Sequence, residues 1–405
     1  MTETAVSPHS PAQVFSRPWI FGPHTDLIVS IGGMLAGFSL FFMFTVLGWD
    51  VLLVWLVWVV TLDTPHFFAS YFRTYLDKEE RRTSRRLLIG TLSVFLIGPA
   101  VLLLCATLYY MDAQQFRLPW VLFGNAVSAW AYVHITRQHY GILRLYNRKG
   151  GESGTEEAKL DSIVLYGCLA LAFAGLLMRL PQGRRRIGLG PWSPIPDNFW
   201  SSPLHTLANL PADEMLFFAA GLGVALLVAR YVLFQIGKFI RREPINLPKV
   251  IFLATVIFLH SFMAFSGLLA GTTVLGFTAV VTIYHDIQYF FVVWFYAKNR
   301  YGRSPAPRRQ YGLAGTLSKS FPLFLITGIV LVSLPIWGFG CLINRVPACA
   351  TGPQFGTPTF MGETVWILFF AWLTSGFQMH HYILDQFIWR PSRSARLREE
   401  LKLDR

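Results

Sequence analysis

Residues 51–73 read VLLVWLVWVVTLDTPHFFASYFR. A membrane span needs about 20 mostly apolar residues, so this stretch is predicted to be a membrane-crossing helix. It carries two ionisable residues, Asp63 and His66, and it ends at Arg73. An ionisable group is costly in hydrocarbon, so one found inside a span is a functional candidate.

The whole chain has the composition of a membrane protein. Of its 405 residues, 53% are hydrophobic and 14% are charged, and the mean hydropathy is +0.45. A soluble domain carries about 25% charged residues. The net charge of +13 comes from short basic runs between apolar segments. Such runs are typical topology signals, so no nucleic-acid partner is expected.

We predict an all-α, polytopic transmembrane helical bundle of about ten spans. A single transmembrane domain covers 26–390 and includes an outer loop at about 181–213. A tail at 1–25, which lacks the pattern of a signal peptide, precedes the domain, and a basic tail at 391–405 follows it. The predicted spans are 27–47, 51–72, 87–109, 118–142, 161–180, 214–238, 249–269, 272–297, 320–342 and 362–388.

Basic runs follow the even-numbered spans, which places those ends and both termini in the cytoplasm. A multi-pass protein of the bacterial inner membrane is the expected location. If the opposite side is the periplasm, Cys341 and Cys349 could form a disulfide there.

Nine histidine and aspartate residues form four clusters inside the predicted spans. Histidine is the commonest protein ligand of metals, and carboxylate often accompanies it. All nine are therefore predicted metal ligands, although each aspartate could instead orient a ligand histidine. They are Asp63, His66, His134, His139, His285, Asp286, His380, His381 and Asp385.

These residues lie on the second, fourth, eighth and tenth spans, which all run in one direction. His66 lies seven residues before Arg73, and His380 lies ten before Arg390. At 1.5 Å per residue, these separations are depths of roughly 10 and 15 Å. The spacing predicts one shared layer in the cytoplasmic half of the bilayer.

Helical spacing assigns some of these residues to one face. Asp63 and His66 (i, i+3) share a face, as do His381 and Asp385 (i, i+4). His380 points about 100° away from His381, so it could bind a second metal or act from outside the ligand set.

Aromatic residues follow the clusters. They are typical of an interfacial belt, but Tyr289 and Tyr382 are also candidate catalytic residues that orient bound oxygen. His260 lies on the seventh span, away from the clusters, and is expected to make a helix–helix hydrogen bond.

The ligand set favours an oxidation catalyst. Six histidines are too many for one open mononuclear site, so we predict two iron ions, with O2 as cosubstrate and an external electron donor. The substrate is expected to be lipid-like or otherwise hydrophobic, and a redox partner would bind on the cytoplasmic face.

A family resemblance supports this chemistry. His134-Ile-Thr-Arg-Gln-His139 is an H-x4-H box, and His380-His381 is a histidine pair. Together they resemble the histidine boxes of membrane fatty-acid desaturases and hydroxylases, which are non-haem diiron enzymes. The chain departs from that family because it lacks H-x2-HH boxes, has more predicted spans and places its histidines within helices. The resemblance implies an oxygenase, hydroxylase or desaturase without naming the substrate.

Two other functions fit part of the pattern. Histidine pairs could be axial ligands of haem in an electron-transfer or oxidase subunit. Buried Asp and His could also serve a metal-coupled or proton-coupled transporter, although no inverted repeat is visible.

Overall fold

The structure is a computed structural model that describes residues 14–113, 116, 118–179, 212–266, 274–302, 308–338, 359–360 and 363–403. The described chain is almost entirely helical, which confirms the predicted all-α class. It divides into two compact units. Unit 1 comprises residues 1–48 and 138–284, with residue 405, and unit 2 comprises residues 49–137 and 285–404.

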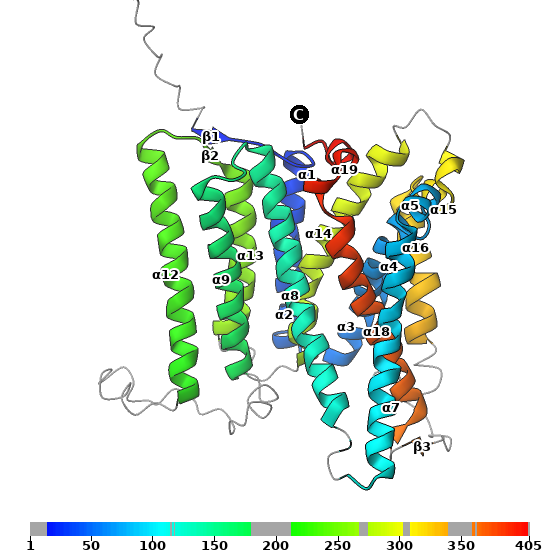
Figure 1. The fold of residues 1–405 in the computed structure, drawn as a ribbon. Helices are drawn as coiled ribbons and strands as arrows, with labels where there is room; N and C mark the ends of the chain where they lie inside the picture. The colour runs from blue at the N-terminus through cyan, green and yellow to red at the C-terminus, as the bar shows by residue number, and fades with distance from the viewer. Residues whose placement is uncertain are drawn as a thin grey trace, which may run out of the picture. The chain divides into compact units, whose positions relative to one another are not determined.

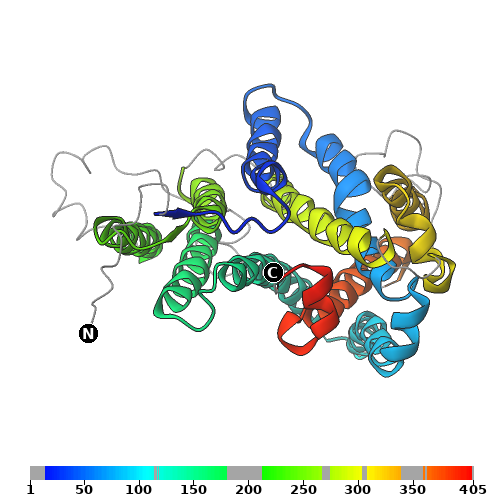
Figure 2. The same cartoon turned by 90° about the horizontal axis from the view of Figure 1, so that it is seen from above.

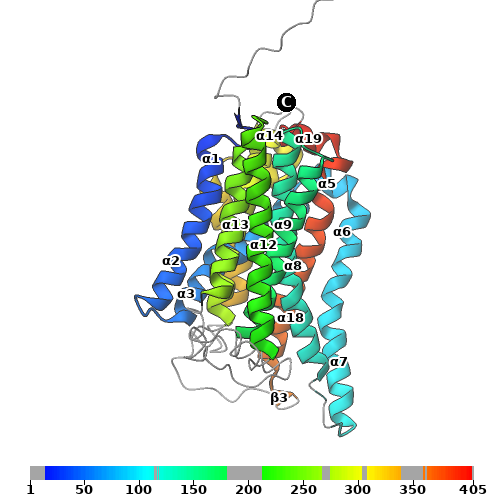
Figure 3. The same ribbon diagram turned by 90° about the vertical axis from the view of Figure 1, so that its left-hand side faces the viewer.

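Unit 1 is built from long apolar helices. Its α9, α12 and α13 run alongside one another (Figures 1 and 3). The parallel strands β1 (Phe15–Ser16) and β2 (Ile245–Asn246) also belong to it. Its helical segments are α1 (Pro23–Leu27), η2 (Ile28–Gly32), α2 (Gly33–Thr45), the end of α8 (Leu118–Lys149), α9 (Glu156–Arg179), α12 (Ala212–Ile240), α13 (Leu247–Phe265) and the start of α14 (Val274–Gly302).

Small residues let helices of unit 1 approach closely. A Cβ atom added to Gly33 would lie 2.3 Å from Cδ2 of Tyr284, and one added to Gly37 would lie 2.7 Å from the carbonyl oxygen of Val280. Glycine therefore permits contact between α2 and α14, as small residues do at helix interfaces in membranes.

Unit 2 contains the remaining helices, which Figure 2 views from above with α4 in blue and α18 in orange-red. The antiparallel strands β3 (Thr359–Phe360) and β4 (Glu363–Thr364) also belong to it. Besides the start of α8 and the end of α14, its helical segments are α3 (Val51–Trp58), η3 (Val59–Asp63), α4 (Thr64–Arg73), α5 (Lys78–Thr83), α6 (Arg85–Thr91), η4 (Leu92–Leu96), α7 (Ile97–Tyr110), η6 (Arg308–Tyr311), α15 (Leu313–Leu317), α16 (Phe321–Gly328), η7 (Ile329–Gly338), α18 (Val365–Ile388), η9 (Pro391–Arg393) and α19 (Ala395–Glu400).

Six of the described helices are long and apolar enough to cross a membrane, so the chain is a multi-pass membrane protein. They are Pro23–Thr45, Leu53–Arg73, Arg85–Tyr110, Glu156–Met178, Glu214–Ile240 and Leu247–Phe265. The other predicted spans coincide with α8, α14, α18 and the shorter apolar helix Phe321–Trp337. Their membrane crossing, the total of ten and the cytoplasmic termini stay predictions. The outer loop at 181–213 falls almost wholly outside the described residues, and Cys341 and Cys349 lie outside them.

A change of helix type separates α3 from α4. The segment η3 is π-helical and ends at Asp63, two residues before Pro65. Proline has no N–H to donate, and its ring clashes with the carbonyl four residues earlier. Widening the preceding turn accommodates both effects, and π-turns of this kind are frequent at functional sites. The irregular turn carries Asp63 and directly precedes the turn with His66.

Arg300 joins three segments of unit 2. Its Nε donates to Oδ2 of Asp77 at 2.9 Å, and its Nη1 donates to Oε1 of Glu400 at 2.8 Å. Asp77 also caps α5, since its Oδ1 accepts the backbone N–H of Glu79 at 2.8 Å. The end of α14 is thus tied to α5 and α19.

Candidate metal centre

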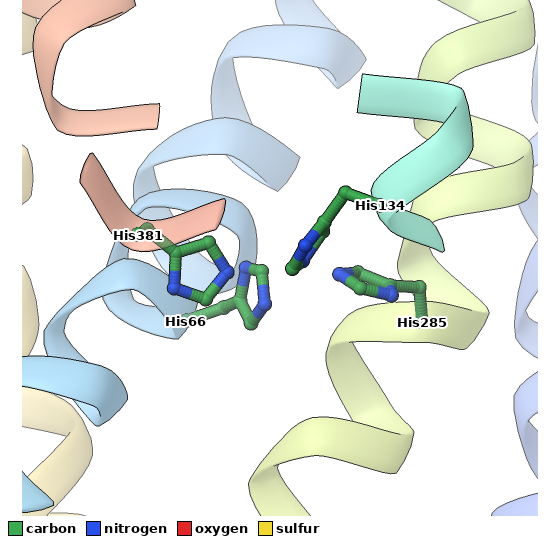
Figure 4. Close-up of side chains that lie close together, drawn as sticks. All are labelled: His66, His134, His285 and His381. Carbon is green, nitrogen blue, oxygen red and sulfur yellow. The ribbon is translucent and has the colours of Figure 1, made fainter. Parts of the chain in front are cut away.

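Four histidines from four helices of unit 2 converge on one buried region (Figure 4). We call them the four-histidine group: His66 on α4, His134 on α8, His285 on α14 and His381 on α18. The most exposed of them, His134, shows 6% of its surface. Such rings are held together only if something offsets the loss of hydration at their nitrogens.

The distances within this group suit a metal ion. Each residue offers one ring nitrogen, and these nitrogens lie within 4.8 Å of one another. A metal–nitrogen bond is about 2.0–2.1 Å long, so two ligands on opposite sides of one ion lie at most about 4.2 Å apart. The 4.8 Å limit on the nitrogen separations is close to that span, so the four rings are grouped as the ligands of one ion would be.

A second set of candidate ligands shares His66. The acidic group, as we call it, consists of Asp63, His66 and Asp286, whose ligand atoms also lie within 4.8 Å of one another. Nδ1 of His66 is 3.5 Å from Oδ1 of Asp286. The indole Nε1 of Trp58 donates to Oδ2 of Asp286 at 3.1 Å, which fixes that carboxylate. The two groups together offer four imidazoles and two carboxylates side by side.

Ser70 holds the ring of His381 in place. Its Oγ lies 2.8 Å from Nδ1 of His381, 2.7 Å from Oδ1 of Asp385 and 2.6 Å from the hydroxyl of Tyr289. The Tyr289 hydroxyl is also 2.7 Å from Oδ1 of Asp385, and it accepts Nε1–H of Trp389 at 3.1 Å.

One arrangement of hydrogens satisfies every donor in this network. Ser70 and Tyr289 both donate to Asp385, so the oxygen of Ser70 is left to accept Nδ1–H of His381. This tautomer leaves Nε2 as the lone-pair nitrogen, and Nε2 has no hydrogen-bond partner among the described residues. Fixing one nitrogen so that the other can ligate is the usual arrangement around metal-bound histidine.

Two members of the four-histidine group, His66 and His134, have surroundings that suit a ligand. Nε2 of His66 is buried and has no hydrogen-bond partner in the described part of the chain. The ring of His134 stacks on Tyr382, with centroids 4.3 Å apart and an interplanar angle of 25°. Tyr382 therefore orients a candidate ligand, while Tyr289 belongs to the network that holds His381.

The structure gives His380 hydrogen-bond partners of its own, outside the four-histidine group. Its Nε2 lies 3.1 Å from the hydroxyls of both Tyr75 and Thr91, and its Nδ1 lies 3.2 Å from the hydroxyl of Tyr71. Burial raises the pKa of Tyr75, and the hydrogen bond to Thr91 opposes that rise. Both ring nitrogens of His380 are engaged, and the residue belongs to neither ligand group.

His139 belongs to unit 1 and is a member of neither ligand group. Its ring centroid is 5.6 Å from that of His260 and 5.6 Å from that of Tyr284. The structure therefore brings together six of the nine predicted ligands, while His139, His380 and Asp385 lie outside these groups. Asp385 is nevertheless close to His381, with Oδ2 3.6 Å from Nε2.

Sequence reasoning missed Ser70 and Trp58. Ser70 lies four residues after His66 on α4. The i, i+4 spacing that grouped other residues therefore places it on the same helix face. The contact of Trp58 with Asp286 joins two distant segments, and no local spacing signals it.

The donor set is made of nitrogen and oxygen. The described cysteines, Cys105 and Cys168, belong to neither group. Such a set suits iron, manganese, copper or zinc rather than thiolate-bound clusters. Comparison of the chain with protein-family models, with curated proteins and with solved structures found no match.

Proposed function

We propose that the protein is a membrane metalloenzyme that oxidises a hydrophobic substrate with O2 at a centre formed by the four-histidine and acidic groups. The observation that carries the proposal is the convergence of four buried imidazoles, with ligand nitrogens within 4.8 Å, in a chain with membrane-spanning helices. Buried ionisable groups at such a site are retained for function more often than for stability.

We propose iron as the metal, with two ions bound. His66 belongs to both ligand groups, so a second ion held by Asp63 and Asp286 would lie beside the first. Nitrogen and carboxylate ligands suit iron, and the bound metal would supply the O2 chemistry that amino-acid side chains lack.

The protein would contribute orientation and exclusion of water. Ser70 keeps His381 in the tautomer that presents Nε2, and Tyr382 fixes the plane of the His134 ring. The hydroxyl of Tyr289 donates to Asp385. This hydrogen bond would hold the Tyr289 hydroxyl close to His381. Burial of all four imidazoles would keep water away from the reacting groups.

The test compares two adjacent histidines. We expect His381→Ala to lose most of the bound metal, whereas His380→Ala keeps it, because His380 hydrogen-bonds to Tyr71, Tyr75 and Thr91. Metal content of the purified proteins, measured by mass spectrometry beside their absorption spectra, gives the result. Equal metal content in both variants would refute the proposed centre.

The spectra and stoichiometry also separate this proposal from other functions. An intense Soret band would indicate haem in place of non-haem iron. Weak, exchangeable metal together with uptake into proteoliposomes would indicate a transporter. Oxygen consumption that depends on a reductant and a hydrophobic substrate would support the oxidase function.

A further inference from the structure

Arg73, the last residue of α4, is a buried cation held by two aromatic rings. Its guanidinium carbon lies 3.8 Å from the ring centroid of Trp389 and 4.5 Å from that of Tyr296. Only 5% of the residue surface is exposed. A buried arginine normally pairs with a carboxylate, because an unpaired charge is costly in an apolar environment.

Within the described part of the chain, Arg73 forms no such pair. Nε and Nη1 of Arg73 are buried and have no hydrogen-bond partner among the described residues, and the same holds for the hydroxyl of Tyr296. Asp385 and Glu400 are acidic groups within electrostatic range of Arg73. Asp385 accepts hydrogen bonds from Ser70 and Tyr289, and Glu400 accepts one from Arg300.

Aromatic contact with a guanidinium leaves its N–H groups free to bind in their own plane. Those groups form a rigid fork that matches the oxygens of a carboxylate or a phosphate. We propose that Arg73, with the hydroxyl of Tyr296, binds the oxyanion headgroup of an amphiphile, either a carboxylate or a phosphate.

The position of Arg73 explains why the anion would belong to an amphiphile. Arg73 ends the helix that carries His66, seven residues earlier, which is a rise of about 10 Å. A charged head bound there would lie at the end of the membrane-crossing segment Leu53–Arg73, which is where the headgroup of an amphiphile meets the membrane. On the proposed function, on which this step rests, the amphiphile is the substrate.

A hydrogen-bonded connection links this site to the metal centre. Trp389, which contacts Arg73, donates to Tyr289, and Tyr289 shares Ser70 and Asp385 with His381. An anion bound by Arg73 would therefore lie close to Trp389, which is hydrogen-bonded to the network around His381.

The experiment measures binding of dodecanoate, dodecyl phosphate and dodecanol to the full-length protein in nanodiscs, by equilibrium dialysis with radiolabelled ligand. We expect saturable binding of one or both anions, and at least about tenfold weaker binding of the uncharged alcohol. Arg73→Gln should weaken anion binding by a similar factor, and Tyr296→Phe, which keeps the ring, should weaken it less. Arg390→Gln is the matched control, because it also removes one positive charge. The guanidinium of Arg390 already donates to the carbonyl oxygen of Gln386, so this variant should leave anion binding unchanged.

Several outcomes would overturn the inference. They are equal binding of anion and alcohol, unchanged anion binding in both Arg73→Gln and Tyr296→Phe, and inorganic phosphate competing as strongly as dodecyl phosphate. The Tyr296→Phe variant keeps the test valid if Arg73→Gln does not fold. Metal content, measured in the same samples, should stay at the wild-type level, so loss of the headgroup site is distinguishable from failure of the metal centre.

Discussion

The hydroxyl oxygen of Ser70 lies 2.8 Å from Nδ1 of His381, and the two residues are 311 positions apart in the chain. This contact joins α4 to α18 and, in the tautomer assigned above, leaves Nε2 of His381 as the nitrogen available to a metal. A residue with no metal-binding chemistry of its own therefore helps to define the candidate centre.

Replacing Ser70 should weaken metal binding without removing a ligand. In Ser70→Ala, Nδ1–H of His381 loses its acceptor, so we expect metal affinity to fall by about 10- to 100-fold, as for other residues that hold a ligand histidine. Competition with a chelator measures this change. Ser39→Ala is the control, because the exposed hydroxyl of Ser39 donates to the carbonyl oxygen of Leu35 within its own helix. An unchanged affinity in Ser70→Ala would contradict the assigned tautomer.

The acidic group should determine how many ions bind. We expect a double substitution, Asp63→Asn with Asp286→Asn, to lower the stoichiometry from two ions to one, because the four-histidine group keeps all its nitrogens. Metal analysis of the purified variant checks this. A wild-type stoichiometry of one ion would instead mean that Asp286, 3.5 Å from Nδ1 of His66, orients that ring.

Packing of α7 against α18 should depend on Gly98. A Cβ atom added there would lie 2.0 Å from Cδ1 of Trp372, so Gly98→Ala forces the helices apart. Overpacking of this kind costs about 1–3 kcal/mol. We expect a lower midpoint of thermal unfolding in detergent. Gly124→Ala on α8 adds a Cβ atom with no neighbour within 4 Å, and an equal loss of stability there would contradict the packing argument.

Arg300 should matter far more for stability than Arg396. Arg300→Leu leaves the fully buried Asp77 without its cation, and breaking a buried pair costs about 3–5 kcal/mol. Arg396 is exposed and pairs with the half-exposed Glu79, so Arg396→Ala should cost about 1 kcal/mol or less. Denaturant unfolding of the two variants, followed by circular dichroism, compares the free energies of unfolding. Similar losses would mean that the buried pair contributes no more than the exposed one.

Hydropathy was sufficient to predict the helical class, but it was insufficient for the arrangement of helices. The segments that carry His134, His285 and His381 are helical as predicted, yet none of them is among the six described helices that are long and apolar enough to cross a membrane. The polar ligands lower the mean hydropathy of these three helices. A search for long apolar segments therefore finds them less readily.

Helical spacing predicted part of the candidate site. The i, i+3 pair of Asp63 and His66 does lie within one ligand group. The rings of His380 and His381 also point in different directions, as expected. His381 belongs to the four-histidine group, whereas His380 contacts the hydroxyls of Tyr71 and Tyr75. Spacing along one helix carries no information about partners on another helix, so the hydrogen bonds of Ser70 and Trp58 could not be predicted.

The four histidines at the centre come from four separate helices, and the last of them, His381, follows the third, His285, by 96 residues. During synthesis the first three are made long before the fourth leaves the ribosome. The ligand set is therefore complete only after α18 has been made, and an ion cannot be fully enclosed before then. Metal loading would accordingly act as a checkpoint of biogenesis, in which only chains that have inserted α18 are loaded and truncated chains stay empty.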